Sequence, residues 1–203
     1  QISQEFRAES SAKGPLQWIG GLFYFKEDIQ IDSISFDSLA PGNPQNSAYA
    51  TQNQSSKSYA AFGSLNYTVS DALKLRAGLR YTSDKKDFSA KRVEATTAGP
   101  FNLNDTSHNV SWDLSGTYVL TPHTNAYARI ATGYRAPSMQ GRLNGLADRP
   151  SFAGAEKVLP VEAGIKQDLF DKRARLSLAV FQYRVKDKQL TAGSGVINMN
   201  QLL

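Results

Sequence analysis

Apolar and polar side chains alternate with a period of two along much of this chain. In residues 73–82, LKLRAGLRYT, every odd-numbered position is apolar, whereas the even-numbered positions include Lys74, Arg76 and Arg80. Residues 57–69 alternate in the same way. Because successive side chains of a β-strand point to opposite faces, this pattern predicts strands with one apolar face and one polar face.

The same period predicts a series of strands along the whole chain. They lie at residues 1–10, 16–30, 57–69, 73–82, 109–120, 125–134, 161–166 and 173–190, and another begins near Val196. In the last full strand, the apolar set that contains Leu178 competes with the set that contains Phe181. The pattern therefore leaves the facing of residues 173–190 open.

The connections between these strands are expected to alternate in length. Short turns are predicted at residues 11–15, 70–72, 121–124 and 169–172, and long loops at 31–56, 84–107 and 135–157. A meander has this form when one edge of the sheet needs only turns and the other carries working loops. The strands, at about 10–16 residues, exceed the usual 5–6 of soluble sheets and suffice to cross a bilayer at a tilt.

We therefore expect an all-β fold, an antiparallel up-and-down transmembrane β-barrel meander of about nine strands. A spanning helix is not indicated, because the longest apolar run, Trp18–Phe25, is far shorter than the roughly 18 residues that such a helix needs. A soluble up-and-down barrel is the alternative that this pattern leaves open.

The two faces differ in charge. Between its tyrosines, the apolar face of residues 57–69 holds only Ala, Gly and Leu. The opposite faces carry ionisable side chains that a dry core would not accommodate, so we expect them to face a water-filled lumen or another polar element. These candidate lumen-facing residues are Lys74, Arg76, Arg80, Asp113, Glu162 and Lys166. A large barrel, which has room for water or a plug, fits them better than one of eight strands.

Aromatic residues recur near the ends of the apolar faces. Tyr59 and Tyr67 lie eight positions apart, about 20 Å along the membrane normal for a tilted strand. Such a separation is typical of the two aromatic girdles of a membrane barrel. The candidate girdle residues are Tyr59, Tyr67, Tyr81, Trp112, Tyr118 and Tyr134.

Composition narrows the function classes. The formal net charge is +5, but Lys and Arg are dispersed, so nucleic acid is not an expected partner. Cysteine is absent, which excludes disulfides and thiolate metal sites. His108 and His123 are the only histidines, and neither has metal-ligand spacing or a Ser and Asp partner. We therefore expect no metal, no cofactor and no enzymatic activity.

Three segments resemble a known family. Residues 125–143, NAYARIATGYRAPSMQGRL, contain Tyr127-Ala128 followed by Gly133-Tyr134-Arg135-Ala136-Pro137, and resemble a late barrel strand of TonB-dependent outer-membrane receptors as it rises into an extracellular loop. The segment EKVLPVEAGIKQDLFDKRARLSLAVFQYRVKD resembles the next hairpin of that family. SQEFRAES with WIGGLFYFKED resembles an earlier hairpin of the same barrel. The resemblance covers essentially the whole chain.

The resemblance implies a fold and a function. Such receptors are 22-stranded barrels closed by an N-terminal plug, and they import ferric siderophores, cobalamin or oligosaccharides with energy from TonB. Residues 1–203 are then expected to be a partial barrel domain, without the plug and the remaining strands. The expected location is the outer membrane of a Gram-negative bacterium. The expected partners are outer-membrane lipid, the plug of the same receptor, TonB through the N-terminal region, and a small-molecule ligand such as an iron chelate.

Cations of the loop at residues 135–157 are candidates for binding an anionic ligand, by focusing the local field. They are Arg135, Arg142, Arg149 and Lys157. A merely solvated loop is the alternative for these four. At the start of the loop, Tyr134 suits the membrane surface, and Pro137 has no amide hydrogen to continue the ladder.

Two other function classes stay open at this point. A small complete outer-membrane barrel, acting as an anchor, an adhesin or a passive porin, needs only these strands. A soluble carbohydrate-binding β domain needs no lipid-facing surface.

Overall fold

The computed structural model describes residues 1–11, 14–36, 39, 41–42, 45–93, 97–141, 143, 149–192 and 195–199. Among these residues the regular elements are all strands. They are β1 (Ile2–Glu9), β2 (Leu16–Phe36), β3 (Gln45–Thr68), β4 (Leu73–Val93), β5 (Ala98–Thr121), β6 (Thr124–Ala131), β7 (Gly133–Arg135), β8 (Ser138–Gln140), β9 (Ser151–Ala153), β10 (Glu156–Leu169), β11 (Ala174–Lys186), β12 (Gln189–Ala192) and β13 (Gly195–Asn198).

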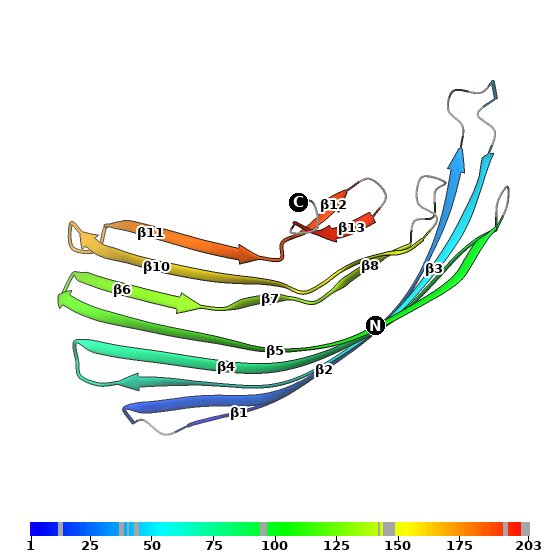
Figure 1. Cartoon of the computed structure of the whole chain (residues 1–203). Coiled ribbons are helices and arrows are strands. Elements are labelled where there is room, and N and C mark those ends of the chain that lie inside the picture. Colours follow the sequence, from blue (N-terminus) through cyan, green and yellow to red (C-terminus); the bar gives the residue numbers. More distant parts are fainter. Residues whose placement is uncertain are drawn as a thin grey trace.

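Nine of these strands form one antiparallel sheet. Its order is β1-β2-β3-β4-β5-β6-β10-β11, and β7 continues the line of β6 beside β10. The pairs β8–β9 and β12–β13 form two small separate sheets. Figure 1 shows the large sheet as a curved, open wall, with β12 and β13 lying within its bend. The expected all-β, up-and-down meander of about nine strands is confirmed.

The short connections β1–β2, β3–β4, β5–β6 and β10–β11 lie at one end of the sheet, at the left of Figure 1. We call this the turn end and the opposite end the far end. At the turn end, strands β3 and β4 are joined through residues 69–72 and strands β10 and β11 through residues 170–173. The predicted short turns at 70–72, 121–124 and 169–172 are therefore confirmed, whereas the one at 11–15 includes residues 12 and 13, which lie outside the described residues.

The predicted long loops at 31–56 and 84–107 are wrong for most of their length. Strands β2 and β4 each contain 21 residues, and strands β3 and β5 each contain 24. Only residues 94–97 separate β4 from β5. The connections therefore do not alternate strictly between short and long, because much of what looked like loop continues the sheet.

The reason is that the apolar face of each long strand becomes polar partway along the strand. The face that carries Leu79 and Tyr81 near the turn end carries Asp87 and Ser89 near the far end, while the apolar Phe88 is on the opposite face. The pairing of β3 with β4 runs without a shift from Tyr49 to Thr68, so the change is in the sequence and not in the register. A search for one continuous apolar face therefore ends the predicted strand where the polarity of that face changes.

The register also settles the facing of residues 173–190. Ile165 pairs with Leu178, and Ala163 pairs with Val180. Directly paired residues share a face. The set that contains Leu178 therefore lies on the apolar face of the sheet, and Phe181 lies on the other.

The compact core of the molecule lies at the far end. Ala50, Phe88 and Ala90 of strands β3 and β4 pack against Met139 and Leu143 of the segment after Pro137. Leu143 is fully buried. The segment that leaves the sheet at Pro137 therefore folds back over the end of the wall. No helix among the described residues is long and apolar enough to cross a membrane.

Candidate functional site

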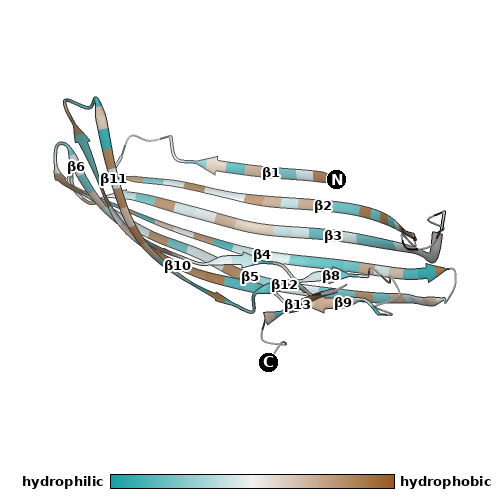
Figure 2. Ribbon diagram, turned by 90° about the horizontal axis from the view of Figure 1, so that it is seen from above, coloured by the Kyte–Doolittle hydropathy of each residue, from teal (hydrophilic) through white to brown (hydrophobic). Residues whose placement is uncertain are grey.

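The sheet has two chemically distinct faces near the turn end. One face carries Leu65, Leu79, Leu114 and Val180, and we call it the outer face. Leu79 is 60% exposed and Val180 is 75% exposed. A contiguous exposed apolar surface of this kind is characteristic of contact with lipid or with another protein. Figure 2 shows hydrophobic segments recurring along β2 to β5, with hydrophilic stretches toward the far ends of β3 and β4.

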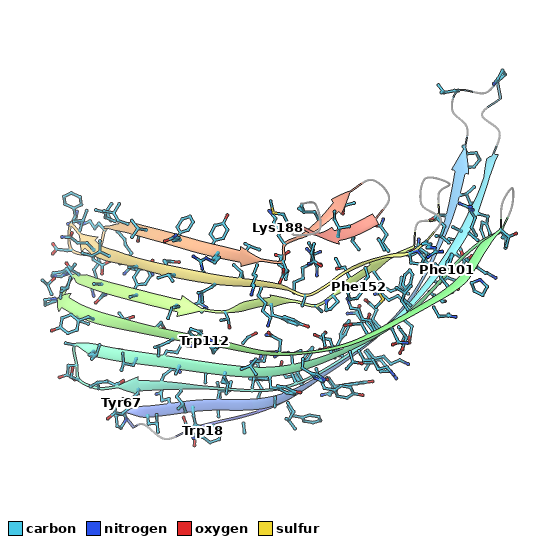
Figure 3. All side chains as sticks on the ribbon, viewed as in Figure 1. Trp18, Tyr67, Phe101, Trp112, Phe152 and Lys188 are labelled. Atoms are coloured by element: carbon cyan, nitrogen blue, oxygen red, sulfur yellow. The ribbon has the colours of Figure 1, made fainter. Side chains whose placement is uncertain are left out.

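Aromatic side chains stand at both margins of this apolar band. On β3, Tyr67 lies near the turn end and Tyr59 toward the far end, and Tyr67 is labelled in Figure 3. The Tyr59 ring lies 5.1 Å from that of Tyr24, and the Tyr81 hydroxyl lies 3.1 Å from Nδ1 of His108. The register puts Tyr59, Tyr67, Tyr81, Trp112 and Tyr118 on the outer face, and their role as girdles stays a prediction.

Tyr134 differs from the other five aromatic candidates. It is half-buried, and its hydroxyl lies 2.9 Å from Oγ of Ser107. It therefore ties the end of β7 to β5.

The opposite face, which we call the inner face, carries the charges. The six residues expected to face a lumen all lie on it: Lys74, Arg76, Arg80, Asp113, Glu162 and Lys166. Glu162 pairs directly with Arg129. The sequence pattern therefore sorted these six residues onto one face correctly, and their function stays a prediction.

Most of these charges have partners within the sheet. Nε of Arg76 lies 3.7 Å from Oδ2 of Asp113. The Arg80 guanidinium lies 5.2 Å from the centre of the Phe23 ring. Nζ of Lys166 lies 5.2 Å from the centre of the Tyr127 ring. The hydroxyl of the same Tyr127 donates a hydrogen bond to Glu162, so this tyrosine links Lys166 to Glu162.

Arg7 and Arg129 are among the inner-face arginines that the sequence pattern did not indicate. Arg7 pairs with Gly21 of β2, and Arg129 lies between Ser115 and Glu162. The alternation in residues 125–134 carries the signal for Arg129, since its neighbours Ala128 and Ile130 are apolar. We therefore add Arg7 and Arg129 to the six predicted residues as candidates for contact with the material on the inner side of the sheet.

At the far end, the inner face is covered by the segment that begins at Ala136. Nζ of Lys86 donates a hydrogen bond of 2.6 Å to the Pro137 carbonyl, and the Gly141 amide donates one of 3.0 Å to Oε1 of Gln52. A guanidinium nitrogen of Arg92 donates to the Leu143 carbonyl at 3.2 Å. We call residues 136–141 together with 143 the covering segment.

Gln189 fastens the covering segment to the C-terminal hairpin. Its side-chain amide donates to the carbonyl oxygens of Ala136 and Gly154, at 2.9 Å each, and its Oε1 accepts from Ser138. Its backbone amide donates to Glu156 at 2.7 Å. These contacts join residues that are distant in the sequence, and the sequence pattern gave no sign of them.

The covering segment also changes the environment of Lys86. Burial lowers the pKa of the Lys86 amino group below its ordinary value of 10.5, and the neighbouring Asp84 carboxylate opposes this effect. Arg135 acts on it in the same direction as burial. The Lys86 amino group at the far end of the inner face is thus half-buried among charged side chains of both signs.

The four loop cations predicted to bind an anionic ligand do not form one cluster. Arg135 pairs with Glu156, whereas Lys157 pairs with Tyr134, so Arg135 and Lys157 lie on opposite faces of the sheet. Arg149 is exposed. Arg142 lies outside the described residues. Ligand binding by these four stays a prediction, and Arg135 is placed best for it because it shares the inner face with the other charges.

The described residues contain no group of three or more His, Asp or Glu side chains placed to hold a metal ion. The geometry is that of a wall with one apolar face and one charged face.

Comparisons with known proteins agree with this geometry. A family model described as TonB dependent receptor-like, beta-barrel, matches residues 2–201. The pesticin receptor of Yersinia enterocolitica is 29% identical over 136 residues, which cover 66% of this chain and 20% of that receptor. The pesticin receptor of Yersinia pestis matches with the same identity and coverage.

Solved structures show the same fold. The ferric yersiniabactin uptake receptor FyuA from Yersinia pestis superposes with a TM-score of 0.76 at 24% identity, covering 97% of this chain and 29% of that one. The closed form of the ferric-catecholate import receptor Fiu from K12 E. coli gives a TM-score of 0.72 at 15% identity, with coverage of 97% and 33%. The present chain thus spans 20% of the length of its curated relatives and about a third or less of these structures.

Proposed function

Because the chain belongs to the TonB-dependent receptor-like β-barrel family, we propose that it forms part of the wall of an outer-membrane receptor that imports a ferric chelate. Barrels of this family are outer-membrane proteins of Gram-negative bacteria, and its members are transporters. The outer face contacts lipid, and the inner face contacts the plug and the aqueous path of the ligand.

The proposal rests on one observation: successive residue pairs of the same two strands lie on opposite faces of different chemistry. Leu79 and Trp112 pair on the outer face, while Arg80 and Ser111, one position along, pair on the inner face. A charged side chain at the bilayer midplane costs about 2–4 kcal/mol in a barrel, so a lipid-facing band without charges is expected only where lipid is the solvent. The charges of the inner face need water or a polar partner.

The choice of ligand class rests on the relatives. Two of the similar structures are named for ferric yersiniabactin and ferric-catecholate uptake. Arg135, at the far end of the inner face, would attract an anionic chelate by focusing the local field. Energy from TonB and closure by a plug are part of the proposal for the complete receptor.

Transport is tested in a strain that lacks the gene for the complete receptor. Restoring the gene should restore uptake of radiolabelled iron supplied as ferric yersiniabactin or as a ferric catecholate. A protonophore should abolish this uptake, because TonB draws on the proton gradient. Uptake that persists with the protonophore would favour a passive porin, and no uptake of either chelate would refute the ferric ligand class.

The loop cations are tested by titrating the purified complete receptor with the chelate that it transports. Replacing Arg135 and Arg142 by Gln should weaken binding about tenfold or more, as expected for the loss of charge-assisted contacts. The control Lys172→Gln/Arg173→Gln removes the same charge at the turn end and should leave affinity unchanged. Equal affinities of the two double variants would remove Arg135 and Arg142 from the site.

A further inference from the structure

Three lysines lie side by side on the outer face, at the level where that face changes from apolar to polar. Lys26 of β2 pairs with Lys57 of β3, and Lys57 pairs with Lys85 of β4. Directly paired residues of an antiparallel sheet have Cβ atoms about 4.5–5.5 Å apart. The three ammonium groups can therefore reach the same anion. We call Lys26, Lys57 and Lys85 the lysine row.

Like charges placed directly opposite each other destabilise a sheet, so the lysine row needs compensation. Part of it comes from two carboxylates further toward the far end. Nζ of Lys26 lies 3.2 Å from Oδ2 of Asp28, and Nζ of Lys85 lies 3.8 Å from Oδ2 of Asp87. Three cations and two carboxylates leave one positive charge, and the half-buried Lys57 stands between the two pairs.

The depth of the lysine row follows from the tyrosines beside it. Tyr24 and Tyr59 pair two residues nearer to the turn end than Lys26 and Lys57, with their rings 5.1 Å apart. Two residues correspond to about 7 Å of strand, or roughly 5 Å along the normal of a tilted sheet. Since tyrosines mark the membrane interface, the lysines lie at the depth of lipid headgroups.

An apolar hollow adjoins the lysine row on its lipid side. Its volume is about 430 Å³, and its lining includes Phe6, Leu22, Tyr24, Tyr59 and Tyr81. A hydrocarbon chain fits such a surface, while a phosphate fits three ammonium groups. The two features together match the two ends of a single lipid molecule.

We propose that the lysine row and this hollow form a binding site for a phosphorylated lipid of the outer leaflet. The phosphate contacts Lys26, Lys57 and Lys85, and an acyl chain lies in the hollow beside Phe6 and Leu22. Asp28 and Asp87 lie on the water side of the site, where they hold two of the lysines in place. The site rests on the proposed function, because it needs the outer face to lie in a bilayer.

The test uses the complete receptor, purified in a non-ionic detergent, with diphosphorylated lipid A as the probe. Native mass spectrometry measures the bound fraction as lipid A is titrated. The variant Lys57→Gln/Lys85→Gln should bind at least fivefold more weakly, because each basic residue near an anionic lipid surface contributes roughly a fivefold change in affinity. The control Lys91→Gln/Lys188→Gln loses the same charge at positions away from the site and should bind as the wild type does.

A second probe separates the two ends of the lipid. Lipid A from which both phosphates have been removed should bind the wild type and the Lys57→Gln/Lys85→Gln variant equally. Replacing Leu22 by Ala should weaken binding of both lipids. Equal binding of diphosphorylated lipid A by the two double variants would overturn the site, as would undiminished binding of the dephosphorylated lipid to the wild type.

These outcomes are distinct from a failure of the proposed function. Binding is measured in micelles, so it does not depend on transport of a chelate. Fractionation of cells shows separately whether the receptor reaches the outer membrane. A heat-modifiable band on gels confirms that each variant has a folded barrel.

Discussion

Arg80 and Phe62 face each other across strands β4 and β3, and the guanidinium carbon of Arg80 lies 5.7 Å from the centre of the Phe62 ring. The same guanidinium also lies over Phe23 of β2, so one cation links three neighbouring strands on the inner face. A cation over an aromatic ring contributes about 0.5–1 kcal/mol at exposed sites and more where water is excluded.

We predict that this contact is measurable in a double-mutant cycle. Arg80→Gln and Phe62→Leu, made singly and together in the complete receptor, should show a coupling of about 0.5–1 kcal/mol in the free energy of unfolding by denaturant. The cycle of Arg76→Gln with Phe62→Leu serves as a control, because Arg76 contacts Asp113 instead. Additive effects of Arg80→Gln and Phe62→Leu would show that the rings only cover the cation.

Gly164 leaves room for the Tyr127 ring, which lies against it. These residues are cross-strand partners, and a Cβ at Gly164 would lie 2.6 Å from Cε1 of Tyr127 and 2.6 Å from the Leu178 carbonyl oxygen. We predict that Gly164→Ala lowers the free energy of unfolding by about 1–3 kcal/mol, as overpacking does. The displaced ring would also release Glu162 and Lys166.

A matched substitution tests this explanation. At Gly20 the nearest atom to a new Cβ is the Phe62 carbonyl oxygen at 3.6 Å, an ordinary contact. Gly20→Ala should therefore change the free energy of unfolding by less than about 0.5 kcal/mol. Similar losses from Gly20→Ala and Gly164→Ala would point to backbone effects instead of the Tyr127 ring.

Lys86 is expected to anchor the covering segment. Lys86→Met removes the donor of the 2.6 Å hydrogen bond to the Pro137 carbonyl, and hydrogen bonds from charged groups contribute about 1.5–3 kcal/mol. Amides of residues 138–141 should then exchange hydrogen roughly tenfold faster or more. The measurement is hydrogen exchange followed by mass spectrometry, and Lys91→Met is the control on the same strand. Unchanged exchange would show that Met139 and Leu143 hold the segment by packing alone.

The turn between β10 and β11 should depend on pH through Asp168. Nε of Arg175 donates a hydrogen bond of 2.6 Å to Oδ1 of Asp168, which lowers the pKa of that carboxyl below its ordinary value of 3.8. A carboxyl with a lowered folded-state pKa stabilises the fold above pH 3.8, and this stabilisation is lost as the pH falls through the lowered value.

The predicted signature is a difference that disappears in acid. At pH 6, Asp168→Asn should raise hydrogen exchange at residues 170–175 relative to the wild type. The difference should shrink below about pH 4 and vanish when Asp168 is fully protonated. Exchange rates are corrected for their intrinsic pH dependence. A difference that stays constant from pH 6 to pH 2.5 would show that the Asp168 charge is not involved.

Much of the wall could be predicted from alternation alone. Near the turn end, Arg76 and Leu79 fall on opposite faces because lipid and water impose opposite preferences on successive residues. The lengths of β3 and β5 could not be predicted, since the outer face of each strand changes from apolar to polar partway along it.

The contacts at the far end could not be predicted from the sequence for a second reason. The Gly141 amide bonds to Gln52 across 89 residues, and Ser138 bonds to Gln189 across 51. Such pairings depend on where the sheet brings its strands, and no local pattern encodes them. The predicted end of the ladder at Pro137 agrees with this arrangement, but no local pattern indicates the inward course of the residues that follow.

The outer face of β3 changes from apolar to polar along the strand, so its two halves suit different solvents. A tilted crossing of the hydrocarbon layer takes about 9–11 residues, and β3 contains 24. In bulk water the turn-end half of β3 would expose apolar side chains to solvent. In bulk lipid its far-end half would place polar side chains in contact with hydrocarbon. Both halves of the strand lie in a favourable solvent only when the boundary between lipid and water is at Lys57. The sequence of β3 therefore specifies the position of the strand along the membrane normal as well as its conformation. Each residue contributes to fixing the depth of the sheet relative to the membrane surface.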